Sequence, residues 1–191
     1  MSTFAPVKPL RPAWQIALLA AFGALLIAFT AVAILGYATH DSFSWRTWLL
    51  LGVSFAVAFS ATSWAAAQWM SPSGRTPFWG PVLALVLAVR GLDSGSELGI
   101  FVASWAGLCF SIGSIFSLAT GVFLVVVFRR TAPIMRQRVS TAVGILSGFA
   151  GFLTIQLHCP IHEFWHMLTG HALLPIIWGL IGYFVSRLAF R

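Results

Sequence analysis

The chain has 191 residues, of which 59% are hydrophobic and only 8% are charged, and its mean hydropathy is +0.93. Soluble domains carry about 25% charged residues, so this composition excludes a water-soluble globular protein and indicates an integral membrane protein. The formal net charge of +7 does not call for a nucleic-acid partner, because the basic residues gather in loops on one side of the predicted spans.

The first thirteen residues are predicted to form a short extended arm. Three prolines (Pro6, Pro9 and Pro12) fall within it, together with Lys8 and Arg11. Each proline lacks an amide donor and restricts the residue before it, so a continuous helix is excluded here. Residues 1–13 are therefore treated as an arm, and residues 14–191 as a single transmembrane domain.

Six later stretches are apolar enough to cross a bilayer, which requires about 20 residues of helix. The pattern predicts an all-α membrane protein, a bundle of six transmembrane helices with a short interfacial helix on the outer side. The third span is short because Arg90 interrupts it, and Cys109 begins the fourth. The predicted spans are residues 14–37, 47–69, 78–92, 108–128, 139–157 and 172–188, and the interfacial helix is residues 98–107.

The fifth predicted span is rich in glycine. Gly144 and Gly148 are four residues apart, a spacing of small residues that lets another transmembrane helix approach closely. The sequence thus predicts a tight helix–helix contact along this span.

The basic residues set the orientation of the six spans. Lysine and arginine concentrate in cytoplasmic loops, and six spans place both termini on one side. The acids, histidines and cysteines then fall on the other, outer side. Both termini are therefore predicted to be cytoplasmic, together with nine of the basic residues: Lys8, Arg11, Arg75, Arg129, Arg130, Arg136, Arg138, Arg187 and Arg191.

Residues 158–171 hold four of the five histidines and one of the two cysteines. Pro160 suits a first helical position and Gly170 a helix end, so a helix between them would place His162 and His166 on one face. Cys159 would precede that helix, where unpaired amides favour a thiolate. With His171 and Cys109 added, these side chains are candidate ligands for zinc or another thiophilic metal.

Two other interpretations of this segment remain open. Residues 162–166 match H-E-x-x-H, the metalloprotease pattern in which the glutamate acts as base. No acidic residue follows Glu163 to supply a third ligand, so an intramembrane protease is the weaker alternative and the chain is expected not to be an enzyme. The histidines could also be ordinary residues of the membrane surface, with the cysteines as small apolar fillers.

The chain resembles the NrsF-type negative regulators of sigma factor F, six-span bacterial anti-sigma proteins. The resemblance lies in residues 6–12 (PVKPLRP), Cys109, residues 129–133 (RRTAP), the glycine-rich fifth span, residues 157–160 (LHCP) and the pair Trp165–His166.

This resemblance implies an inner-membrane protein that binds an extracytoplasmic-function sigma factor and releases it under metal or oxidative stress. Cys109 and Cys159 would sense the heavy metal or oxidant. The sigma-binding surface would comprise the cytoplasmic residues Lys8, Arg11, Arg129, Arg130, Arg136 and Arg138. A small membrane metal-binding protein without a sigma partner is the main alternative.

Overall fold

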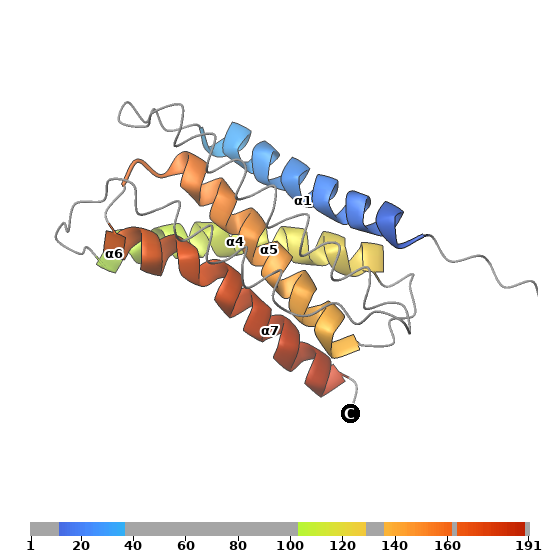
Figure 1. The fold of residues 1–191 in the computed structure, drawn as a ribbon. Coiled ribbons are helices and arrows are strands. Elements are labelled where there is room, and N and C mark those ends of the chain that lie inside the picture. The colour runs from blue at the N-terminus through green and yellow to red at the C-terminus, as the bar shows by residue number, and fades with distance from the viewer. Residues whose placement is uncertain (1–11, 37–102, 129–135, 162–163, 190–191) are drawn as a thin grey trace, which may run out of the picture.

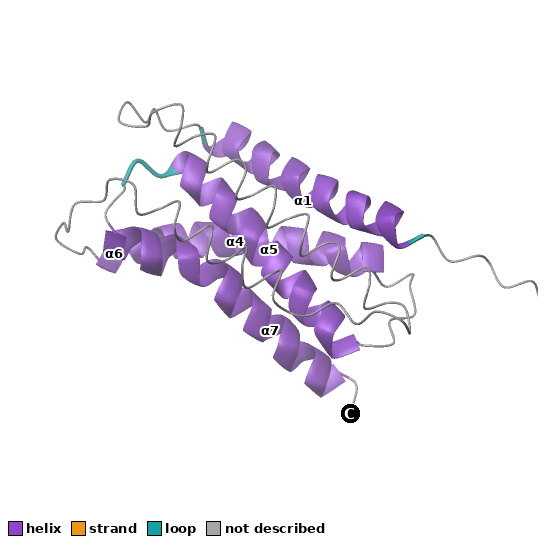
Figure 2. Ribbon diagram, in the orientation of Figure 1, coloured by secondary structure: helices purple, strands orange, loops and turns teal. Residues whose placement is uncertain are grey.

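The computed structural model describes residues 12–36, 103–128, 136–161 and 164–189, and within these ranges it contains helices and no strand (Figures 1 and 2). The all-helical prediction is confirmed for this part of the chain. The predicted spans at 47–69 and 78–92 lie outside it. The helices are α1 (Ala13–Leu35), α4 (Ala103–Phe128), α5 (Arg136–His158), α6 (Phe164–His166), the π-helix η1 (Met167–Ala172) and α7 (Leu173–Ala189).

Four helices among the described residues are long and apolar enough to cross a membrane. They cover Trp14–Leu35, Trp105–Phe128, Gln137–His158 and Met167–Arg187, with lengths of 21 to 24 residues. At 1.5 Å per residue, each is about as long as the hydrocarbon core is thick. The predicted first, fourth, fifth and sixth spans therefore correspond to real helices.

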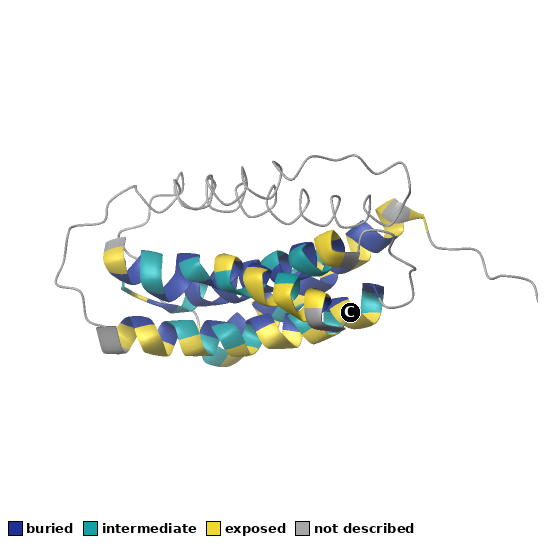
Figure 3. Cartoon of the chain, turned by 90° about the horizontal axis from the view of Figure 1, so that it is seen from below, coloured by how far each residue is buried: buried dark blue, intermediate teal, exposed yellow. Residues whose placement is uncertain are grey.

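Helix α5 is the centre of the bundle. In the span formed by α5, 83% of the residues are buried, whereas in the other three spans only 22–33% are buried. Across the bundle, the buried residues face inward and the exposed residues face outward (Figure 3). The core side chains of α5 include Leu146, Phe149 and Phe152. The outward faces of α1 and α4 carry large exposed apolar side chains such as Phe22 and Ile115, as suits contact with lipid.

The long helices alternate in direction (Figure 1). The start of α1, the end of α4, the start of α5 and the end of α7 share one end of the bundle. At the opposite end, Gly36 terminates α1 with a φ of 89°, which glycine adopts without steric cost. There His158 Nδ1 lies 2.8 Å from the Gly36 carbonyl oxygen, which joins the ends of α5 and α1.

The predicted division of residues 98–128 into two helices is wrong where the structure describes it. Helix α4 runs without a break from Ala103, so Cys109 lies well inside the helix rather than at its first turn. No proline or charged residue interrupts this stretch. Gly107 does not end the helix either; it is exposed, and a Cβ there would meet no atom of the described residues within 4 Å.

The helix predicted between Pro160 and Gly170 is also misplaced. Pro160 and Ile161 are non-helical, and α6, η1 and α7 follow one another directly from Phe164. Gly170 lies inside η1, where a Cβ would stand 3.1 Å from the carbonyl oxygen of Ala106. Its glycine thus permits close contact with α4 instead of ending a helix.

The close helix contact predicted along α5 is confirmed, and its partner is α7. A Cβ at Gly148 would stand 2.6 Å from the carbonyl oxygen of Leu174 and 2.7 Å from the nitrogen of Pro175. A Cβ at Gly144 would clash with the carbonyl of Trp178. Backbone meets backbone here, and among the helix pairs that the structure describes α5 and α7 share the most extensive contact.

Candidate metal and thiol site

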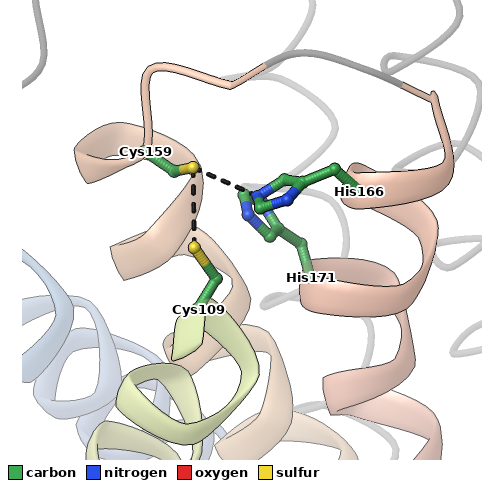
Figure 4. A group of neighbouring side chains, drawn as sticks. All are labelled: Cys109, Cys159, His166 and His171. Atoms are coloured by element: carbon green, nitrogen blue, oxygen red, sulfur yellow. Dashed lines mark hydrogen bonds between the residues drawn. The ribbon is translucent and has the colours of Figure 1, made fainter. Parts of the chain in front are cut away.

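Four buried side chains from three parts of the chain converge at the end of the bundle where α1 ends and α4 begins (Figure 4). Cys109 comes from α4, Cys159 follows α5, His166 ends α6 and His171 lies in η1. Their candidate ligand atoms all lie within 4.8 Å of one another. The predicted ligands Cys109, Cys159, His166 and His171 therefore come together.

The two thiols form the centre of this cluster. The Sγ atom of Cys109 donates a hydrogen bond to the Sγ atom of Cys159 across 3.6 Å, and both cysteines are free. Cysteines fifty residues apart in sequence meet because α4 and α5 run in opposite directions and bring these ends together.

Cys159 does not lie at a helix N-terminus, contrary to the prediction. Its amide donates to the carbonyl of Ile155 across 2.8 Å, so it continues the C-terminal end of α5, where the helix dipole does not favour an anion. The pKa of the Cys159 thiol is nevertheless lowered, chiefly by the hydrogen bond from Cys109, while burial acts in the opposite direction.

The π-helix explains the histidine pair. His166 Nε2 lies 3.3 Å from Cys159 Sγ, and the rings of His166 and His171 have centroids 5.2 Å apart. In an α-helix, residues five apart diverge by about 140°, but the wider turn of a π-helix stacks them on one face. The expected pairing of His162 with His166 assumed α-helical spacing, and His162 lies outside the described residues.

His171 has one hydrogen-bonded nitrogen and one without a partner. Its Nδ1 lies 3.2 Å from Oε1 of Gln156, whereas Nε2 has no hydrogen-bond partner among the described residues. The side chain of His171 is fully buried. Gln156 was missed from the sequence, although an amide within an apolar span is itself a signal of function.

Of the other predicted site residues, only Arg136 and Arg138 lie in the described part of the chain, and neither belongs to this cluster. Glu163 lies outside the described residues, as do Lys8, Arg11, Arg129 and Arg130. Arg136 begins α5, and Arg138 is exposed, directly before the buried Val139. Because Arg138 and Cys159 are 21 residues apart on or next to α5, they are separated by about 30 Å.

Two thiols and two imidazoles form the donor set of four-coordinate zinc sites, and thiolates also bind other soft metals. Two thiols this close can alternatively be oxidised to a disulfide after a modest approach. The cluster can therefore bind a metal or undergo reversible oxidation.

The sequence of the chain was compared with those of known protein families. A family model described as negative regulator of sigma F matches residues 2–191. No curated protein and no solved structure matches the chain.

Proposed function

Because the chain belongs to the family of negative regulators of sigma F, we propose that it is a membrane anti-sigma factor that sequesters an extracytoplasmic-function sigma factor. The family match, which extends over residues 2–191, is the observation that carries this proposal. The sigma factor would be held at the cytoplasmic face and kept from RNA polymerase. The protein itself would contact no nucleic acid and catalyse no reaction.

The proposed membrane orientation follows from the ends of the helices. The start of α1, the end of α4, the start of α5 and the end of α7 share one end of the bundle (Figure 1). The exposed Arg138 lies in the first turn of α5 and the exposed Arg187 in the last turn of α7. Basic residues favour the cytoplasmic side, so we assign this end to the cytoplasm of the bacterial inner membrane. Because α1 ends and α4 begins on the same side of the membrane, the chain between them must cross the membrane an even number of times. The apolar stretches 47–69 and 78–92 would supply two such crossings, which gives six transmembrane spans in all.

The Cys/His cluster is the proposed sensor on the outer side. A thiophilic metal would bind the Cys109 and Cys159 thiolates with release of their protons. Hydrogen peroxide, a two-electron oxidant, would instead take two electrons and two protons from the two thiols, leaving a disulfide and two molecules of water. Support comes from the 3.6 Å separation of the sulfur atoms.

Helix α5 offers a physical connection from the sensor to the sigma factor. Cys159 follows its outer end, Arg136 and Arg138 lie at its inner end, and glycine contacts fix it against α7. A bond or metal between Cys109 and Cys159 would tie the outer end of α4 to that pair. In the proposed two-state mechanism, the inner ends then shift and the basic segment of residues 129–138 releases the sigma factor.

The test is affinity purification of the detergent-solubilised protein from its host, with mass spectrometry of the co-purifying proteins. The proposal predicts recovery of one extracytoplasmic-function sigma factor. A double Cys109→Ser/Cys159→Ser variant should retain it and no longer release it on addition of cadmium or peroxide. Absence of any sigma factor from the wild-type preparation would refute the anti-sigma assignment.

The buried cluster also supports the second candidate, a membrane metalloprotein without a sigma partner. Stoichiometric zinc in a preparation that retains no sigma factor would favour it. The protease alternative requires that Glu163→Gln abolish cleavage of a substrate by the protein.

A further inference from the structure

Gln156 and His171 form a buried hydrogen-bonded pair, and a sensor made of two thiols alone would have no need for this pair. Gln156 is 3% exposed and His171 is fully buried; Gln156 lies near the C-terminal end of α5 and His171 lies in η1. A polar side chain buried in this way costs free energy unless it is paired. The amide oxygen of Gln156 provides a hydrogen-bond partner for only one of the two ring nitrogens of His171.

The hydrogen bond to Gln156 determines which imidazole nitrogen is free. An amide oxygen only accepts hydrogen bonds, so the Nδ1 atom of His171, 3.2 Å from Oε1, carries the proton. The Nε2 atom then holds a lone pair, and it has no partner in the described part of the chain. An unpaired lone pair beside two sulfur atoms and a second imidazole is a ready metal ligand.

The surroundings of this lone pair select the kind of metal. Two sulfur and two imidazole donors lie within 4.8 Å of one another, and among the described residues no carboxylate joins this group. Hard cations such as Mg²⁺ and Ca²⁺ prefer oxygen ligands. A closed set of two thiolates and two imidazoles instead suits tetrahedral zinc.

We propose that Gln156 is a positioning residue that holds His171 as the fourth ligand of a Cys₂His₂ zinc site, completed by Cys109, Cys159 and His166. Such a partner fixes the tautomer and orientation of a ligating histidine. The inference deepens the proposed function, because it uses the sensor thiols, but zinc binding by the purified chain does not depend on a sigma factor. Failure of one therefore leaves the other open to its own test.

The test uses the full-length chain, purified in detergent, reduced and freed of metal, then titrated with Co²⁺ as a spectroscopic substitute for zinc. The wild type should bind one equivalent with the absorption of a four-coordinate thiolate complex. Gln156→Leu removes the acceptor and should weaken binding by about 10- to 100-fold. Gln156→Glu keeps an oxygen acceptor for Nδ1–H and should bind like the wild type.

Thr154→Val provides the matched control. Thr154 is another buried polar residue of α5, but its hydroxyl bonds to the carbonyl of Ala150 and does not contact the cluster. Its cobalt affinity should stay at the wild-type value. Equal affinities of the Gln156→Leu variant and the wild type would overturn the role of Gln156.

X-ray absorption by the zinc-loaded wild type tests the ligand set without any substitution. The site predicts two sulfur neighbours at about 2.3 Å and two nitrogen neighbours at about 2.0 Å. A zinc shell without imidazole nitrogen, or with a single sulfur, would overturn the inference even if Gln156→Leu does not fold.

Discussion

Replacing Gly148 by alanine should loosen the α5–α7 contact that supports the cluster. The new Cβ would clash with the Cα of Pro175 and would stand 2.6 Å and 2.7 Å from two further backbone atoms of α7, whereas ordinary contacts begin at 3.4 Å. No rotamer change relieves a backbone clash, so the helices must separate by roughly 1 Å, at an overpacking cost of about 1–3 kcal/mol. Alanine returns about 1 kcal/mol of helix propensity.

Gly107→Ala is the matched control, because it is also helical and a Cβ there would meet no atom within 4 Å. It should gain the propensity without the clash, so the two variants should differ by about 1–3 kcal/mol. For a chain of this size, each kcal/mol corresponds to roughly 2–4 °C in the midpoint of thermal unfolding.

The measurement is thermal unfolding of both variants in detergent, followed by circular dichroism, with cobalt affinity measured in parallel. The Gly148→Ala variant should unfold at the lower temperature. It should also bind cobalt more weakly, since α7 continues directly from the η1 turn that holds His171. A Gly148→Ala midpoint equal to or above that of Gly107→Ala would refute the packing argument.

Three further predictions concern the thiols and the basic residues. Because the hydrogen bond from Cys109 lowers the pKa of Cys159, the metal-free wild type should retain thiolate absorbance at pH values below about 8.5, the usual pKa of a free cysteine. The Cys109→Ala variant should lose its thiolate absorbance at a higher pH than the wild type. Identical titration curves of the two proteins would contradict this prediction. Zinc-loaded protein should form the disulfide more slowly with peroxide than metal-free protein, and equal rates would exclude thiol ligation. Arg138→Glu should weaken sigma binding several-fold by slowing association, whereas Arg187→Glu, the control at the same end, should not, and equal effects would count against the assigned surface.

Four apolar spans and the placement of both cysteines at one end of the bundle followed from the sequence because they depend on simple properties, whereas the contact between the two thiols was not predicted and is a finding of the structure. Span length and hydropathy predict α1, α4, α5 and α7, and alternating helix direction brings Cys109 to the same end of the bundle as Cys159. The close packing of α5 followed from the spacing of Gly144 and Gly148.

The histidine geometry could not be predicted because it depends on a local departure from α-helical spacing. The assumption of 3.6 residues per turn paired His162 with His166, whereas the π-helix pairs His166 with His171. Gly170, interpreted as a helix end, is instead a point of contact with α4. The role of Gln156 likewise depends on a tertiary hydrogen bond that no sequence motif specifies.

Release of a sigma factor from the purified complex tests the central claim most directly. The complex, reconstituted in liposomes, would be exposed to cadmium or peroxide on the sensor side, and the sigma factor remaining bound would be measured. The account predicts release from the wild type and retention by the Cys109→Ser/Cys159→Ser variant. Equal release from both proteins, or retention by both, would contradict sensing by the thiol pair.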